Sequence, residues 1–261
     1  VSIGGLFAGG LSAGIFLAIL YIGYVLIRGL LDPDFCPSLP PNERATWKEK
    51  LISMKSVFFP GLLILVVLGS ILMGVATPTE AAAFGAAGAL IIGLLKRRLT
   101  WEIVYTSCFE TLGVSAMVGW TMLGAGAFGS VFSGLGGNTL ITNIAMNMPG
   151  GPNMVFLVSA VFIFILGMFL EPGAIIFLAV PIIAPILSRL GFDPLWVGLA
   201  FNVLLQSAYL SPPFGFSLFY LKGCTPPDVD IVEIYKASVP FLLLQIVCIT
   251  AIFMFPDIVR W

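Results

Sequence analysis

The stretch GMFLEPGAIIFLAVPIIAPIL, residues 167–187, decides the fold because a carboxylate, a proline and a glycine interrupt its apolar run. The arms on either side, 155–169 and 174–187, are each shorter than the roughly 20 residues that a helix needs to cross a bilayer. We therefore predict a re-entrant helical hairpin over residues 155–187. A single long helix kinked at Pro172 is the alternative, since proline kinks are common in membrane helices.

Glu171 stands at the tip of the predicted hairpin, just before Pro172 and Gly173. A carboxylate at membrane depth is costly unless it is hydrated, paired or capping a helix. Glu171 is well placed to cap the N-terminus of the second arm, which also favours a negative charge. We expect capping to be its main role, and direct contact with a transported ion is the alternative.

Composition indicates a membrane protein. Of the 261 residues, 59% are hydrophobic and 10% are charged, whereas a soluble domain has about 25% charged residues. The mean hydropathy is +1.08. A net charge of −1 offers no basic face for nucleic acid. Without histidine, and without a nucleophile and base at suitable spacing, the sequence suggests neither an enzyme nor a cofactor site.

The four cysteines lack the spacing of a metal site or a disulfide framework, and we predict that they serve packing; they are Cys36, Cys108, Cys224 and Cys248. No GxxxxGK[ST] loop is present to hold a nucleotide phosphate. Transport by this chain would therefore be driven by a gradient, or by ATP hydrolysed on another chain.

Apolar segments fill nearly the whole length, which predicts an all-α, polytopic helical bundle. We expect spanning helices at 11–30, 58–76, 78–95, 111–132 and 239–255, and short interfacial or surface helices at 100–108, 138–148 and 228–236. A further helical run is expected at 45–56, in the polar segment after the first span. The basic residues between Arg28 and Lys55 and the cluster at 96–98 place both of these loops in the cytoplasm by the positive-inside rule.

The turn at residues 77–80 has the residues of a capping box. Thr77 is the predicted N-cap, Pro78 stands at the first helical position, and Glu80 stands three residues after the cap. We expect Thr77 and Glu80 to act as a structural cap. Contact of this turn with an ion is the alternative.

A second discontinuous element is predicted over residues 195–221, with Ser211, Pro212 and Pro213 in its middle. Two successive prolines remove two backbone donors and so leave carbonyl groups without their helical partners. Broken helices of this kind frame the ion and substrate sites of secondary transporters.

Polar side chains precede this break. Asn202 and Gln206 are four residues apart and share one helix face, and Ser207 follows them. Polar groups are expensive in hydrocarbon, so we expect all three to face an ion or substrate pathway inside the bundle. Hydrogen bonding to neighbouring helices alone is the other explanation.

The chain contains a weak internal repeat: residues 1–14 and 229–242 align without gaps, for example Ile3 with Ile231 and Phe7 with Tyr235. Each segment is predicted to be an interfacial helix that leads into a spanning helix. Repeats at corresponding places are typical of duplicated transporters. The hairpin and broken helix that should precede Val1 are then expected upstream, so the chain reads as the later part of a longer subunit.

Four blocks resemble the large membrane subunit of the tripartite ATP-independent periplasmic (TRAP) transporters, the DctM type. They are GVATPTEAAAFG (74–85), GMFLEPGAIIFLAVPIIAPI (167–186), LSPPFGFSLFYLKG (210–223) and ASVPFLLLQ (237–245), in the family's order and spacing. The resemblance covers essentially all of residues 1–261 and implies one half of an inverted-repeat, elevator-type transporter that lacks its N-terminal repeat.

The resemblance implies a multi-pass protein of the bacterial inner membrane, whose partners are a small membrane subunit and a periplasmic solute-binding protein. A sodium gradient would drive import of a carboxylate-bearing solute such as a C4-dicarboxylate. Sodium is implied near Gly173, Ser211 and Pro212, with Asn202 and Gln206 in the transport domain. Glu171 and Ser211 replace the family's usual aspartate and threonine, and both replacements keep the functional oxygen.

Two other functional readings stay open. A receptor-independent symporter of the divalent-anion sodium type would use similar hairpins. A transport-inactive fragment is the second, because an elevator with one of its two hairpins cannot enclose a site.

Overall fold

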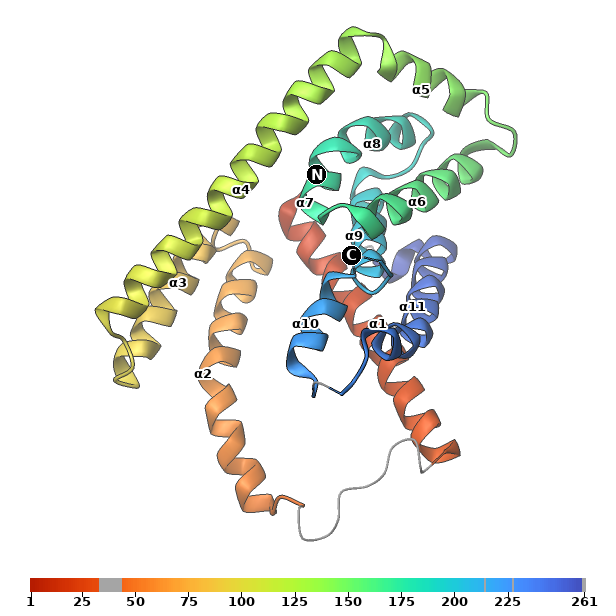
Figure 1. Cartoon of the computed structure of the whole chain (residues 1–261). Coiled ribbons are helices and arrows are strands. Elements are labelled where there is room, and N and C mark those ends of the chain that lie inside the picture. Colours follow the sequence, from red (N-terminus) through yellow and green to blue (C-terminus); the bar gives the residue numbers. More distant parts are fainter. Residues whose placement is uncertain (33–43, 214, 227, 260–261) are drawn as a thin grey trace. The chain divides into compact units, whose positions relative to one another are not determined.

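The computed structural model describes residues 1–32, 44–213, 215–226 and 228–259, and Figure 1 labels their helices. In chain order these are α1 (Ile3–Leu31), α2 (Trp47–Leu72), α3 (Pro78–Leu95), α4 (Trp101–Gly134), α5 (Gly137–Met146), α6 (Gly151–Phe169), α7 (Pro172–Leu178), α8 (Val180–Arg189), α9 (Pro194–Tyr209), α10 (Phe216–Cys224), α11 (Ile231–Met254) and η2 (Pro256–Ile258). None of the described residues forms a strand.

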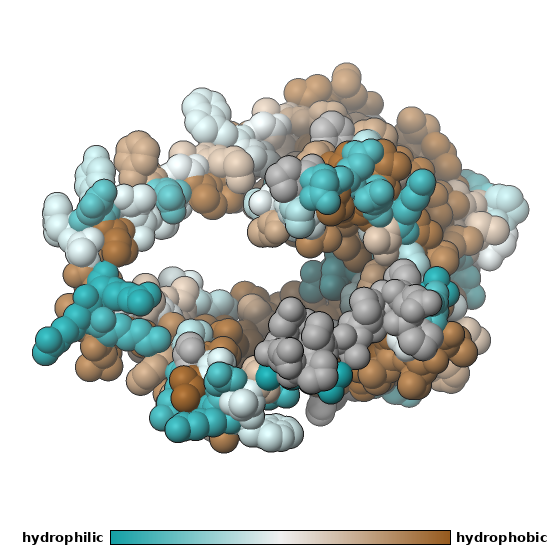
Figure 2. Space-filling view, turned by 60° about the horizontal axis from the view of Figure 1, so that its bottom comes forward, coloured by the Kyte–Doolittle hydropathy of each residue, from teal (hydrophilic) through white to brown (hydrophobic). Residues whose placement is uncertain are grey.

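By length and composition, five of these helices could each cross a membrane, and up to seven spans result if each of two bent helix pairs is counted as one. The predicted all-helical, multi-pass class is thus confirmed. Figure 2 shows hydrophobic side chains over much of the face that it draws, with hydrophilic residues gathered in a few places. Lipid or further protein must cover such a surface.

Contacts divide the chain into two compact units, which are described separately. The unit that contains residues 19–111 holds α2 and α3, which pack against each other. Gly88 allows this approach, because a Cβ at Gly88 would come 2.3 Å from the Cδ1 atom of Leu63. Ile71, Ala76 and Ala81 are buried at the same pair of helices.

In the unit that contains residues 112–261, α9 contacts α6, α8, α10 and α11 (Figure 1). Ten of its sixteen residues are buried, which makes it the centre of this unit. Aromatic rings close one end: the rings of Phe156, Phe192 and Phe253 lie 4.9–6.0 Å from that of Trp196. The Trp196 indole also donates a buried hydrogen bond of 3.2 Å to the Ile252 carbonyl.

The predicted hairpin consists of α6, α7 and α8, which contact one another. Leu170 and Glu171 both have extended backbone between α6 and α7, so the alternative of one continuous kinked helix is wrong. The arms also differ from the prediction. The first extends back to Gly151, and the second bends by 53° between α7 and α8. The re-entrant course stays a prediction, since α6 alone is long enough to cross a bilayer.

Two expected divisions between an interfacial helix and a spanning helix are wrong: 100–108 and 111–132 are joined in α4, and 228–236 and 239–255 in α11. The expected division between 45–56 and 58–76 coincides with a bend of 47° in α2, between Trp47–Lys55 and Val57–Leu72. A continuous helix satisfies its own backbone hydrogen bonds, so a helix that enters a membrane has no reason to end where no breaker stands.

The two segments of the internal repeat begin helices at aligned positions. Ser2 and Asp230, which align, are the N-caps of α1 and α11, and the aligned Ile3 and Ile231 begin those helices. Each helix then continues without the expected break between an interfacial and a spanning part.

The cysteines bear out the packing role only in part. Cys248 is buried, whereas Cys108 and Cys224 are exposed, and all three are free thiols. Cys36 lies outside the described residues.

Candidate ion and solute site

The hairpin tip is held by its own carboxylate. Glu171 is the N-cap of α7, and its Oε2 atom accepts a hydrogen bond of 3.3 Å from the Ala174 amide. The same carboxylate lies over Gly173, where a Cβ would come 2.8 Å from Oε2. A side chain at Gly173 would therefore make the Glu171 carboxylate shift from this position, and the carboxylate remains exposed.

At the break of the discontinuous helix, several backbone carbonyl groups accept hydrogen bonds from side chains and amides. Ser211 is buried, and its amide and hydroxyl donate to the Ala208 carbonyl at 3.2 and 3.0 Å. Pro212 and Pro213 have no amide hydrogen to offer the carbonyls one turn earlier. From α11, Ser238 donates to the Leu210 carbonyl at 3.3 Å.

A second bond from α11 supports the same break. The Tyr235 hydroxyl donates to the Pro213 carbonyl at 3.1 Å. Side chains of α11 thus stabilise the interrupted backbone where the helical pattern stops.

The two breaks lie next to each other. Gly167, near the end of α6, packs against Ala208, near the end of α9, so closely that a Cβ at Gly167 would come 2.3 Å from the Ala208 Cβ. The end of α6 and the end of α9 therefore lie together, and a sodium site between the two breaks stays a prediction.

A partly open stripe runs along the otherwise buried α9. Asn202 and Gln206 are exposed, and Gly198 and Tyr209 on the same face are only partly buried. The spacing of these residues follows one face of a helix. The stripe leads towards the two breaks and carries amide side chains where its neighbours are apolar.

Ser207 does not share this face. It is fully buried, and its hydroxyl donates to the Val203 carbonyl of its own helix at 3.1 Å. The structure thus brings Asn202 and Gln206 together and separates Ser207 from them. The pathway role predicted for Ser207 has no support from this position.

Thr77 and Glu80 form a cap in the other unit. The Thr77 hydroxyl accepts from the Glu80 amide at 3.3 Å, and the Glu80 carboxylate accepts from the Thr77 amide at 2.7 Å. Both bonds of the expected capping box at the start of α3 are present.

Three polar residues of this unit did not stand out in the sequence. Tyr209 ends the open stripe, Ser238 supports the break, and Gln245 is fully buried with no hydrogen-bond partner for its amide. The position of Ser238 and Gln245, seven residues apart on one face of α11, was a signal that could have found them.

The predicted sodium residues offer only neutral oxygens. Gly173 and Pro212 would contribute backbone carbonyls, and Ser211 a hydroxyl whose hydrogen already bonds Ala208. Within the described ranges, no three His, Cys, Asp or Glu side chains are grouped for a metal ion. Carbonyl and hydroxyl oxygens at a broken helix suit a hard monovalent cation such as sodium.

Known proteins are similar in sequence to this chain over nearly its whole length. The sequence model of the family described as tripartite ATP-independent periplasmic transporter, DctM component, matches residues 1–258. The ectoine/5-hydroxyectoine TRAP transporter large permease protein UehC of Ruegeria pomeroyi is 29% identical over 98% of this chain and 59% of its own length. The C4-dicarboxylate TRAP transporter large permease protein DctM of Pseudomonas aeruginosa is 27% identical over the same shares.

A third relative, named for a different solute, has a similar sequence identity to this chain. The isethionate TRAP transporter permease protein DctMQ of Oleidesulfovibrio alaskensis is 30% identical over 94% of this chain and 38% of its own length. The chain thus spans three-fifths or less of these relatives. With the match over residues 1–258, the chain belongs to the DctM component family of the tripartite ATP-independent periplasmic transporters.

Proposed function

We propose that this chain forms part of the membrane permease subunit of a sodium-driven secondary transporter that depends on a solute-binding protein. Its location would be the bacterial inner membrane. One observation carries the proposal: the tip of an interrupted hairpin lies against the break of a discontinuous helix, at Gly167 and Ala208. Paired interruptions of this kind provide backbone oxygens for ions and helix N-termini for anions.

The solute that we propose is a small carboxylate-bearing organic acid. The relatives are named for ectoine, isethionate and C4-dicarboxylates, so kinship favours small polar organic solutes without choosing one. The exposed amides of Asn202 and Gln206 can donate to a carboxylate and accept from a solute hydroxyl or ammonium group.

The proposed partners follow from the family. The family description is that of a tripartite, periplasmic system. We propose a small membrane subunit and a periplasmic solute-binding protein as the other two components. Large exposed apolar side chains along α1, α2 and α4 fit contact with lipid and with such a subunit.

Reconstitution tests this function. The complete subunit that contains this chain, together with its small subunit, is placed in liposomes with an inward sodium gradient, labelled C4-dicarboxylate and the binding protein. Uptake that needs both sodium and the binding protein supports the proposal. Equal uptake with choline in place of sodium contradicts sodium coupling. Equal uptake without the binding protein supports the receptor-independent symporter instead.

A further inference from the structure

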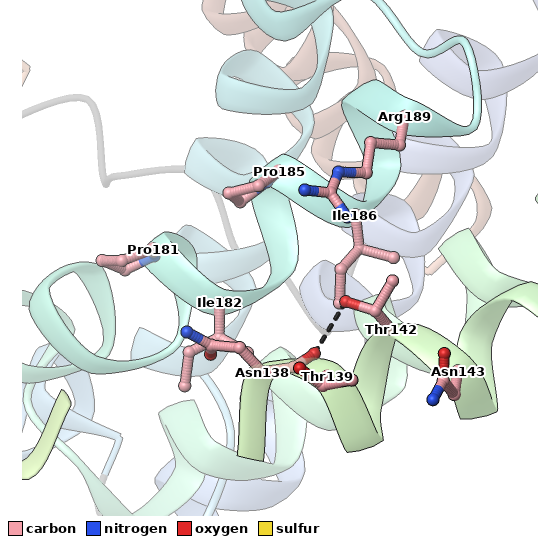
Figure 3. Close-up of a pocket in the computed structure, with 9 residues that line it drawn as sticks. All are labelled: Asn138, Thr139, Thr142, Asn143, Pro181, Ile182, Pro185, Ile186 and Arg189. Carbon is pink, nitrogen blue, oxygen red and sulfur yellow. Dashed lines mark hydrogen bonds between the residues drawn. The ribbon is translucent and has the colours of Figure 1, made fainter. Parts of the chain in front are cut away.

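A polar cavity of about 320 Å³ lies between α5 and α8 (Figure 3). Asn138, Thr139 and Asn143 line it from α5, and Pro181 and Arg189 line it from α8. Figure 3 shows the amide and hydroxyl side chains of α5 facing the proline-containing side of α8. The cavity therefore offers several neutral hydrogen-bonding groups and one guanidinium.

Arg189 is the single ionisable residue among those that line this cavity. It is exposed in the last turn of α8, and no hydrogen bond or ion pair joins it to another described residue. A guanidinium presents planar, paired donors that match a phosphate or carboxylate. The polar cavity thus fits an anionic group.

An apolar groove of about 450 Å³ adjoins the polar cavity. The two share Ile182, and the groove is lined by Phe128, Phe132, Phe162 and Leu166 among others. The one hydroxyl in its lining, that of Ser159, already donates to the Val155 carbonyl at 2.7 Å. No charged side chain of the described residues lines the groove, so it suits a hydrocarbon chain.

We propose that an anionic phospholipid binds here, with its phosphate at Arg189 and an acyl chain in the apolar groove. Charge complementarity and the shared wall at Ile182 select this occupant. A small soluble anion would leave the groove unfilled, and a lipid with a zwitterionic head would bring a cation close to Arg189. The Asn and Thr side chains of α5 can bond the glycerol hydroxyls of a phosphatidylglycerol head.

Lipid binding at this place goes beyond the proposed transport function, because it concerns Arg189 and a groove along the hairpin arms rather than Glu171, Gly173 or the break of α9. The lipid would contact α8, and α7 and α8 form the second arm that starts at Glu171. An occupied groove would fill the space between this arm and the helices α4, α5 and α6, whose residues form the other walls.

Native mass spectrometry tests the proposal on the complete subunit after removal of lipid. Dioleoyl phosphatidylglycerol is titrated against the wild type, Arg189→Gln, Arg189→Lys and Phe162→Asn, with dioleoyl phosphatidylcholine as the lipid control. Arg98→Gln is the matched control, since Arg98 is an exposed arginine that lines neither cavity. Glycerol 3-phosphate is the soluble competitor.

We expect one tightly held phosphatidylglycerol per chain. Arg189→Gln should weaken it at least about tenfold, the usual effect of losing a charge-assisted contact, whereas Arg189→Lys should retain most of the affinity and Arg98→Gln all of it. Phe162→Asn should also weaken binding. Unchanged binding in Arg189→Gln, equal affinity for phosphatidylcholine, or full displacement by glycerol 3-phosphate would each overturn the proposal.

Discussion

Gly167 of α6 lies directly against Ala208 of α9, at a distance that only a glycine permits: a Cβ at Gly167 would come 2.3 Å from that of Ala208. Ala208 is itself buried, and its carbonyl accepts the hydrogen bonds of Ser211. This contact therefore fixes how closely the hairpin and the broken helix approach each other, at the point where the helical backbone of each ends.

Gly167→Ala should lower the thermal unfolding midpoint of the subunit in detergent. The added methyl group overlaps a packed neighbour, and overpacking of a core costs about 1–3 kcal/mol. Ala208→Gly should restore part of the stability in the double variant, because it removes the Ala208 Cβ that the added methyl group would overlap. Gly113→Ala is the control, since a Cβ there meets nothing within 4 Å. A destabilised Gly113→Ala, or no rescue by Ala208→Gly, would show that close packing is not the cause.

Replacing Pro212 and Pro213 together by alanine should abolish the stabilisation that sodium gives. Alanine amides at these positions can bond the carbonyls of residues 208 and 209 and let the helix close. The measurement compares unfolding midpoints in sodium chloride and choline chloride. Pro60→Ala, inside α2, is the control for removing a proline from a helix. Sodium stabilisation that survives the double replacement would contradict the role proposed for the break.

The sequence predicts helix ends well where capping chemistry is strong. The bounds of α3 agree with the prediction because Thr77, Pro78 and Glu80 fix its start. It predicts continuity poorly: nothing between Cys108 and Thr111 breaks the helix, and yet two elements were expected there. The bend before α8 has a local signal in Pro181, since a proline has no amide hydrogen to donate to the carbonyl one turn earlier.

For the candidate site, local pattern predicts the two interruptions and their polar residues but not which side chains share a face with an opening. Asn202 and Gln206 are exposed on α9, whereas the adjacent Ser207 is buried. That difference depends on which helices cover α9, and such packing is a property of the whole unit rather than of the segment.

Asn202→Ala combined with Gln206→Ala should raise the KM for the solute about tenfold or more while the unfolding midpoint changes little. Exposed amides add little to stability, but a lost hydrogen bond to a charged solute costs about 1.5–3 kcal/mol. Ser207→Ala, one residue further on and buried, should leave the KM unchanged. Uptake kinetics in proteoliposomes measure both, and a raised KM in Ser207→Ala alone would reverse the assignment.

Glu171→Gln should fold and retain partial transport, because a glutamine amide oxygen can still accept from the Ala174 amide. Glu171→Leu removes the cap and should lose far more. Asp193→Leu is a matched loss of a cap, since Asp193 caps α9 through the Trp196 amide at 2.9 Å; it should lower stability without changing the sodium response. Equal loss of sodium binding in Glu171→Gln and Glu171→Leu, with folding intact, would make the charge itself the ligand.

The amide of Gln245 is fully buried and lacks a hydrogen-bond partner at both Nε2 and Oε1. Trp196 lies opposite Ile252 and Leu210 opposite Ser238, so α9 and α11 run antiparallel and Gln245 comes level with the apolar Val203. An unsatisfied buried polar group costs about 1–3 kcal/mol. Gln245→Met, which keeps the length of the side chain, should therefore raise the thermal unfolding midpoint of the subunit.

Ser238→Ala provides the contrast, because the Ser238 hydroxyl bonds the carbonyls of Leu210 and Tyr235 at 3.3 and 2.8 Å. Its removal should lower the midpoint, while the removal of the Gln245 amide should raise it. If the two replacements shift the unfolding midpoint in opposite directions, then Ser238 is hydrogen-bonded and Gln245 is not, although both are buried on the same helix face. A lowered midpoint in Gln245→Met would instead show that the amide has a partner in the complete subunit.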